Sequence, residues 1–130
     1  MNILNPAFKG IIKLRWSSID NFLLNPYSTQ VMVFNSLIHA GQFTKFGKEY
    51  NFQKIDHFKD FKKNVPVHEY DDIRHYIQRM MEGEQNILWN TPITWFAKSS
   101  GTTSDKSKFI PVSNESLEDG HYKSAKDVLA

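Results

Sequence analysis

The sequence predicts a mainly helical chain that carries a β-hairpin. Three observations predict it. Apolar residues repeat at helical spacing over much of residues 1–85, helix-start signals precede these repeats, and β-prone segments at 93–97 and 109–112 flank a short polar loop. We therefore expect one domain, 1–130, with a helical region at 1–85, a hairpin at 93–112 and a final helix at 114–130.

Two helical segments are predicted before Gly41. Each begins with an asparagine and a proline, at Asn5–Pro6 and Asn25–Pro26, because asparagine is a good N-cap and proline suits the first turn. The first segment is either continuous or broken near Ser17–Ser18. Both carry apolar stripes that we expect to form core, since an amphipathic helix usually buries that face. The stripe residues are Phe8, Ile11, Ile12, Ile19, Phe22, Leu23 and Leu24, and then Tyr27, Val31, Phe34, Leu37 and Ile38.

Shorter elements are predicted between these helices and the hairpin. Residues 44–52 are predicted to form a turn in which Gly47 supplies backbone freedom. A short helix is expected at 55–61. A longer helix follows, with acidic residues near its start and Gly83 as its stop. Its apolar positions are Tyr70, Ile73, Ile77 and Met80, and the Met80–Met81 pair is expected to fill core. Ser113 is predicted to cap the final helix.

The loop of the predicted hairpin is rich in small polar residues. Residues 99–104 read Ser-Ser-Gly-Thr-Thr-Ser, so five of these six carry a hydroxyl group, and Lys108 stands where the second strand begins. Gly101 permits a close ligand approach, and consecutive N–H groups in such a loop can bind an anion. The loop is not a Walker A motif, which needs a glycine directly before its lysine. Because most loops of this composition bind nothing, the residues alone favour a plain loop over a phosphate site.

The spacing of the loop nevertheless resembles a known motif. Ser99-Ser100-Gly101-Thr102-Thr103, four residues, Lys108, two residues and Pro111 resembles the first nucleotide-binding motif of the acyl acid-amido synthetases. These are the auxin-responsive Gretchen Hagen family of plants and its bacterial relatives. The wider acyl-adenylate-forming group has a shorter loop, Ser-Gly-Thr-Thr-Gly-x-Pro-Lys. This chain has Ser104 for the next glycine, and Asp105 where plant members often have glycine. The Thr-x-Phe-Gly stretch at 44–47 looks like another part of the same family.

The resemblance implies a fold and a reaction. The parent enzyme would be α/β overall and would use ATP with Mg²⁺ to turn a small-molecule carboxylic acid into an acyl-adenylate. An amino acid amine would then attack the adenylate to give an amide. No catalytic residue is assignable within this chain. The residues expected to hold the nucleotide phosphates are Ser99, Ser100, Gly101, Thr102, Thr103 and Lys108.

The resemblance also predicts that the chain is incomplete. It covers nearly all 130 residues but a third or less of such an enzyme, and the apolar pattern of the last helix runs to Leu129 without a stop signal. We therefore expect an N-terminal part that is inactive alone and has the remainder of its own polypeptide as its partner.

Composition excludes several other classes. A formal charge of +2 is too small to argue for nucleic acid or a membrane surface, and there is no apolar run long enough to span a bilayer. The chain lacks cysteine, and its five histidines have no recognisable ligand spacing, so no protein-held metal site is assigned. Without a signal-peptide pattern, a cytoplasmic location is expected.

Two alternatives stay open. A carboxylate–coenzyme A ligase of the same superfamily would share the adenylation step and differ in the acceptor that consumes the adenylate. A non-catalytic helical interaction module would use the hairpin loop only as a connection. Nucleotide titration separates the module from both ligases, and the choice of acceptor separates the two ligases.

Overall fold

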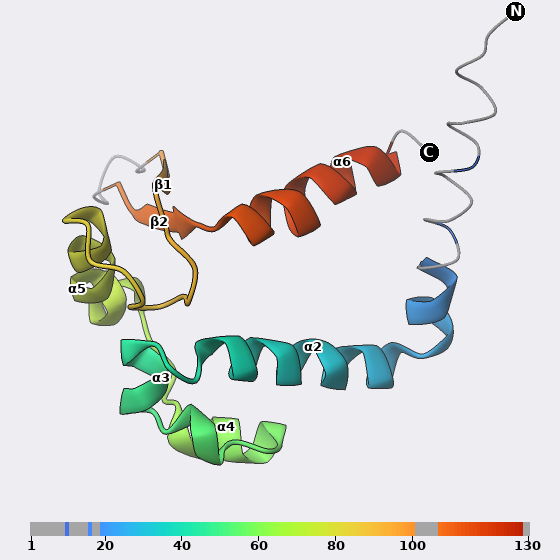
Figure 1. The fold of residues 1–130 in the computed structure, drawn as a ribbon, viewed down its shortest axis with the longest axis horizontal. Helices are drawn as coiled ribbons and strands as arrows, with labels where there is room; N and C mark the ends of the chain where they lie inside the picture. Colours follow the sequence, from blue (N-terminus) through green and yellow to red (C-terminus); the bar gives the residue numbers. More distant parts are fainter. Residues whose placement is uncertain (1–9, 11–15, 17–18, 101–106, 129–130) are drawn as a thin grey trace, which may run out of the picture.

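The computed structural model describes residues 10, 16, 19–100 and 107–128. Two helical arms extend from a cluster of short helices and a β-hairpin (Figure 1). The first arm is α2, Pro26–Gly41, preceded by a helical segment at 19–24. The second arm is residues 114–128, which include a π-helical segment, Ser116–Tyr122, and α6, Lys123–Val128. The described part is therefore mainly helical with one hairpin, as expected.

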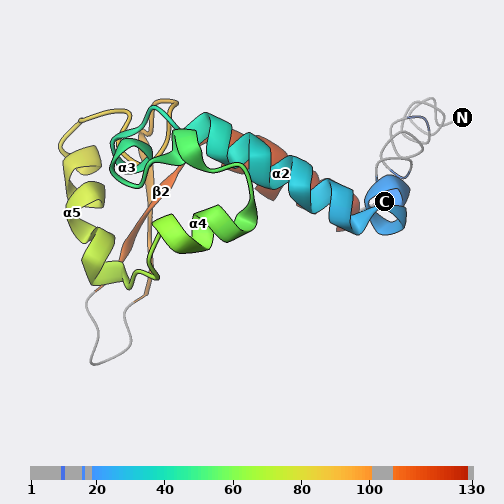
Figure 2. The same cartoon turned by 90° about the horizontal axis from the view of Figure 1, so that it is seen from below.

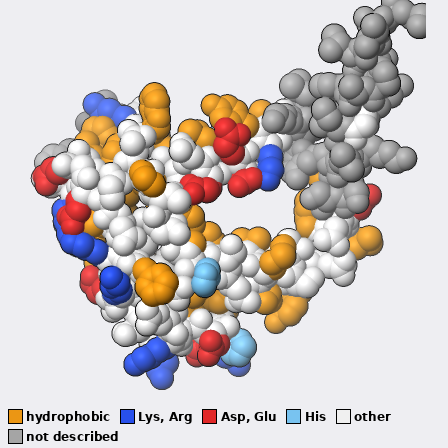
Figure 3. All heavy atoms as spheres, viewed as in Figure 1, with side chains coloured by type: hydrophobic (Ala, Val, Ile, Leu, Met, Phe, Trp, Pro, Cys, Tyr) orange, Lys and Arg blue, Asp and Glu red, His pale blue; other side chains and the backbone are white. Residues whose placement is uncertain are grey.

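The bounds of α2 agree with the prediction, but its burial does not. Pro26 is the first residue and Gly41 the last. Of the predicted core stripe, only Ile38 is buried, whereas Tyr27 is 82% exposed and Leu37 50% exposed. Contacts with the short helices begin at Phe34, in the middle of α2, so the apolar residues of its first half remain exposed. Figure 3 shows an open gap between the two arms.

The earlier stripe is also not core where it is described. Phe22, Leu23 and Leu24 are all exposed, and Ile19 is half-buried. The other predicted stripe residues, Phe8, Ile11 and Ile12, lie outside the described residues.

The corner after α2 is a short helix, not a turn. α3 spans Lys45–Glu49, and the buried Thr44 caps it. The Thr44 hydroxyl donates to the Gly41 carbonyl at 2.7 Å and accepts the Gly47 N–H at 2.9 Å. Gly47 is required for close approach and not for backbone freedom, because a Cβ there would lie 2.0 Å from the Gly41 carbonyl oxygen.

The helix predicted at 55–61 begins later. A 3₁₀ turn, Phe52–Lys54, is followed by an extended residue, and α4 spans Phe58–Asn64. The start is set by a capping box, in which the Asp60 carboxylate accepts the His57 N–H at 3.0 Å. Phe34 of α2 packs edge-on against two rings of α4, with centroid distances of 5.9 and 6.0 Å.

The longest helix of the cluster is α5, Tyr70–Met81. A capping box also starts it, since the Asp72 carboxylate accepts the Glu69 N–H at 2.8 Å. Gly83 ends it with a φ of 98°, a conformation that favours glycine. Met80 is buried, but Met81 is 46% exposed, so only the first of the two methionines fills core.

The core lies between α5, α3 and the segment that leads into the hairpin. Tyr76 and Met80 of α5 are buried against Ile87 and Ile93, and Phe46 of α3 packs on this cluster. The first two N–H groups of α3 donate to the carbonyls of residues 86 and 87, at 3.0 and 3.1 Å. These bonds fix the segment that delivers the chain to the hairpin.

The hairpin consists of β1, Trp95–Lys98, and β2, Phe109–Val112, in antiparallel pairing. The first strand starts two residues later than predicted, because Ile93 belongs to the core. Figures 1 and 2 place α5 beside the hairpin. Ser113 then starts the second arm as predicted, since its hydroxyl accepts the Ser116 N–H at 3.1 Å. Among the described residues, no helix is long and apolar enough to cross a bilayer.

Candidate functional site

The two ends of the hairpin loop are joined by hydrogen bonds. In the register of the strands Lys98 lies opposite Phe109, so Ser99 and Lys108 are the next pair outward. The Ser99 N–H donates to the Lys108 carbonyl at 2.9 Å. The Lys108 N–H donates to the Ser99 hydroxyl oxygen at 3.0 Å. Main chain and side chain together therefore close the loop at its base.

The structure places three of the six predicted phosphate-binding residues. Ser99 and Lys108 are half-buried at the two ends of the loop, and Ser100 is exposed beside them. The other three, Gly101, Thr102 and Thr103, lie outside the described residues.

Positive charges gather around two aromatic rings at the base of the loop. The Lys108 ammonium lies 5.6 Å from the centroid of the Tyr70 ring, and the Arg74 guanidinium lies 5.5 Å from the same ring. The Lys98 ammonium lies 5.8 Å from the Phe109 ring. These distances are within the range of cation–π attraction. The Arg74 guanidinium is also paired with the Asp71 carboxylate at 3.0 Å, so the group of cations includes one acidic partner.

Tyr70 is a site residue that the sequence did not indicate. Its hydroxyl oxygen accepts the N–H of Phe109 at 2.8 Å, and its O–H lies 3.2 Å from the carbonyl oxygen of the same residue. The two residues are 39 positions apart. In the sequence Tyr70 is one position of an apolar helical stripe, and no local pattern marks its contact with the hairpin.

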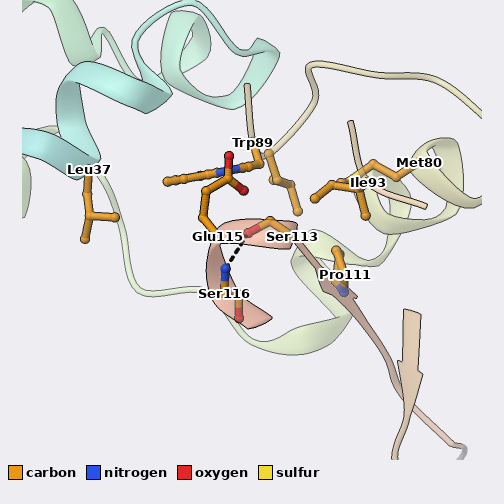
Figure 4. Close-up of a pocket in the computed structure, with 9 residues that line it drawn as sticks. Leu37, Met80, Trp89, Ile93, Pro111, Ser113, Glu115 and Ser116 are labelled. Atoms are coloured by element: carbon orange, nitrogen blue, oxygen red, sulfur yellow. Dashed lines mark hydrogen bonds between the residues drawn. The ribbon is translucent and has the colours of Figure 1, made fainter. Parts of the chain in front are cut away.

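A second feature is an apolar cavity of about 490 Å³ at the junction of α5, the hairpin and the second arm (Figure 4). Glu115 lies at its polar edge and accepts a hydrogen bond from the Thr91 hydroxyl at 3.1 Å. A hydrogen bond from its own backbone N–H is the main cause that lowers the pKa of the Glu115 carboxyl group, and partial burial acts in the opposite direction. The lining residues are Leu37, Met80, Leu88, Trp89, Ile93, Pro111, Ser113, Glu115 and Ser116. Because Glu115 is already hydrogen-bonded, the cavity offers mainly apolar contacts.

The comparison with known families decides where this hairpin belongs. Residues 15–129 match the GH3 family N-terminal domain. The chain belongs to the GH3 family. This confirms the resemblance that the loop spacing indicated.

Similar GH3 proteins include several plant enzymes. Indole-3-acetic acid-amido synthetase GH3.2 of Arabidopsis thaliana is 34% identical over 101 residues, which cover 77% of this chain and 18% of the relative. Indole-3-acetic acid-amido synthetase GH3.3 of the same plant is 31% identical over 88% of this chain and 19% of the relative. Jasmonoyl–L-amino acid synthetase GH3.5 of Oryza sativa subsp. japonica is 41% identical over 61 residues, which cover 46% of this chain and 10% of the relative.

A solved GH3 structure has the same fold over most of the chain. The GH3.15 acyl acid amido synthetase superposes with a TM-score of 0.75 and 32% identity, covering 85% of this chain and 20% of that one. The chain thus spans about one fifth of the length of GH3.2, GH3.3 and GH3.15.

Proposed function

We propose that this GH3 chain is the N-terminal, nucleotide-binding part of an ATP-dependent ligase that joins a carboxylic acid to an amino acid. One observation carries the proposal. In a GH3-family hairpin, Ser99 and Lys108 are hydrogen-bonded across the base of a hydroxyl-rich loop. This brings the lysine to the mouth of a loop whose composition suits phosphate.

The proposed reaction has two steps. A carboxylate oxygen of the acid attacks the α-phosphorus of ATP, and the bond to pyrophosphate breaks. The amine of an amino acid then attacks the acyl carbon, AMP leaves, and the amine loses a proton. The names of the relatives support this substrate class, because they describe synthetases of indole-3-acetic acid and jasmonoyl amides. Segments equivalent to the rest of these relatives would complete the site.

The loop residues have the donors that phosphate binding requires. Ser99 accepts the Lys108 N–H, and a hydroxyl that accepts one bond still has its own O–H to donate. Ser100, Thr102 and Thr103 would add hydroxyl donors, and Gly101 would allow close approach. Lys108 would offset phosphate charge, which is worth most where water is excluded.

Mg²⁺ would enter with ATP as part of the substrate. Within the ranges that the structure describes, no group of three or more acidic or histidine side chains converges on a point that could hold an ion. The phosphate oxygens of ATP, with water, are ordinary ligands of Mg²⁺ and would carry it into the site.

The experiment compares Lys108→Ala with the parent protein in carboxylate-dependent ATP–pyrophosphate exchange, using the complete polypeptide that carries this chain. Loss of a charge-assisted bond is worth roughly 1.5–3 kcal/mol, so the exchange rate should fall by about 10- to 150-fold. Suitable acids are indole-3-acetic, jasmonic and 4-substituted benzoic acids, named from the relatives. Amino acids and coenzyme A, tested as acceptors, identify the second step.

The matched control is Lys63→Ala, which removes the same charge from an exposed position in the last turn of α4. It should leave exchange unchanged. Normal exchange in a folded Lys108→Ala variant would contradict the proposed role of the loop.

A further inference from the structure

We propose that Tyr70 is a positioning residue for Lys108, holding the main chain and the side chain of that lysine ready for phosphate before ATP arrives. The inference rests on the proposed function of Lys108. Tyr70, the first residue of α5, would thus affect nucleotide binding without touching the nucleotide.

The hydroxyl of Tyr70 occupies the free edge of the hairpin. Hydrogen-bonded and non-hydrogen-bonded pairs alternate along an antiparallel ladder. Since Ser99 donates to the Lys108 carbonyl, the next pair, Lys98 and Phe109, directs the backbone groups of Phe109 away from β1. Tyr70 accepts the N–H of Phe109 at 2.8 Å and faces its carbonyl oxygen at 3.2 Å. One phenol therefore takes the place of a partner strand at this residue.

Lys108 is consequently anchored on both sides. Its own N–H and carbonyl are bonded to Ser99 across the hairpin, and the following residue, Phe109, is bonded to Tyr70. If the N–H of Phe109 had no hydrogen-bond partner, the φ and ψ angles of Lys108 would be less restricted. Here both peptide groups that flank its Cα are hydrogen-bonded, so the direction of its Cα–Cβ bond is set by the backbone.

The ring of Tyr70 acts on the other end of the same lysine. The Lys108 ammonium lies 5.6 Å from the ring centroid, a separation at which the attraction is modest at an exposed site. The Arg74 guanidinium lies 5.5 Å from the same ring and is paired with Asp71 at 3.0 Å. The two cations share one ring, so the attraction for each is weaker than it would be for a single cation.

Tyr70 is itself rigidly placed. It is the first residue of α5, directly after the capping box formed by Glu69 and Asp72, and it is half-buried against the hairpin. A side chain on a capped helix start has little backbone freedom. The hydrogen bonds between Tyr70 and Phe109 therefore fix Lys108 relative to α5. A binding group that is already positioned loses less entropy when its ligand binds.

The first test measures the anchor directly, without nucleotide. Tyr70→Phe keeps the ring and removes the hydroxyl, so amide hydrogen exchange in the segment 107–112 of the complete polypeptide should accelerate. Tyr27→Phe, at an 82% exposed tyrosine of α2, is the matched control and should leave that segment unchanged. Unaltered exchange in Tyr70→Phe would overturn the anchor.

The second test measures ATP affinity in a double-mutant cycle. Tyr70→Phe should weaken ATP binding by about 2- to 5-fold, and Tyr70→Leu, which also removes the ring, by about 3- to 10-fold. The KM for ATP should rise by the same factors while the KM for the carboxylic acid stays constant. In a Lys108→Ala background neither change should have a further effect, because Tyr70 acts through that lysine.

The outcomes separate the two proposals. Effects of Tyr70→Leu and Lys108→Ala that simply add would show a general structural role and overturn the positioning role. Weaker ATP binding in Lys108→Ala with none in Tyr70→Leu would overturn the role of Tyr70 and leave the phosphate loop standing. Unchanged ATP binding in both variants would overturn the function proposed for the loop and, with it, the inference.

Discussion

At the scale of single residues, the corner between α2 and α3 is tightly constrained. The Thr44 hydroxyl bonds to both sides of the corner, and Gly47 lies against the backbone of Gly41. The obstacle to a larger residue at 47 is a carbonyl group, which cannot rotate aside like a flexible side chain. The Thr-x-Phe-Gly stretch therefore has a packing explanation in this chain.

We expect Gly47→Ala to lower the free energy of unfolding by about 3 kcal/mol, because overpacking against backbone forces the corner to open. The control is Gly120→Ala. Apart from its chain neighbours and its own helix backbone, no described atom lies within 4 Å of a Cβ built there, so stability should rise by up to about 1 kcal/mol. Urea unfolding of both variants measures the difference. Equal stabilities would contradict the close contact.

Glu84 is a second residue whose environment makes a measurable prediction. The Arg79 guanidinium donates to its carboxylate at 2.7 and 2.9 Å, and the Lys45 ammonium pairs with the same group. Hydrogen bonds from Arg79, and then from Lys45, lower the pKa of Glu84 from 4.5 to about 2. The group thus links the end of α5 to the start of α3.

Because the folded pKa of Glu84 lies below the unfolded value, its ionised form stabilises the fold. That contribution is complete above pH 4.5 and is lost as the pH falls toward 2. We expect Glu84→Gln to be less stable than the parent at pH 7 and to approach it as the pH falls through this window. Denaturant unfolding at several pH values tests this, with Glu82→Gln as the control. A constant difference between Glu84→Gln and the parent from pH 7 to 2.5 would contradict the assignment.

At the scale of elements, the structure agrees with several predictions that rest on local signals, although α4 begins three residues later than predicted despite an equally local capping box. The start of α2 at Asn25–Pro26 and the cap at Ser113 were predictable, because each signal lies within a few residues of the element that it starts. Membership of the GH3 family was predictable from the spacing of the residues between Ser99 and Pro111. The burial of these helices was not predictable. Periodicity shows that a helix has an apolar face, but it does not show which segment covers that face.

Contacts between distant segments were also beyond prediction. Tyr70 meets the hairpin across 39 residues, and its helical spacing would be equally satisfied by an ordinary core position. Gly47 was misassigned because a glycine reads the same in sequence whether it serves an unusual φ or a close approach. Both cases concern partners that only the folded chain brings together.

At the scale of the whole molecule, the exposed face of α2 is the dominant feature. Tyr27, Met32 and Leu37 are each at least half exposed, and Val31 and Val33 lie on the same helix. Figure 3 shows this hydrophobic surface along the gap between the arms. Apolar surface of this extent favours association with other apolar surface.

We therefore expect a solution of the 130-residue chain to self-associate, as measured by sedimentation velocity over a range of concentrations. Val31→Glu combined with Leu37→Glu should weaken association by about tenfold or more, because a buried, unpaired charge is strongly unfavourable. Gln30→Glu with Ser36→Glu adds the same charge at exposed polar positions of α2 and is the control. A parent chain that stays monomeric at high concentration would refute the expectation.

The closed base of the hairpin has a consequence for how this region evolves. Ser99, Lys108 and Tyr70 complete the ladder below the loop, so strand register does not depend on what the loop contains. Changes of loop sequence, such as the serine and aspartate at 104 and 105, can then accumulate with little effect on folding. Divergence within the loop would then leave the hairpin intact, while divergence at its base would remove the scaffold that presents the loop.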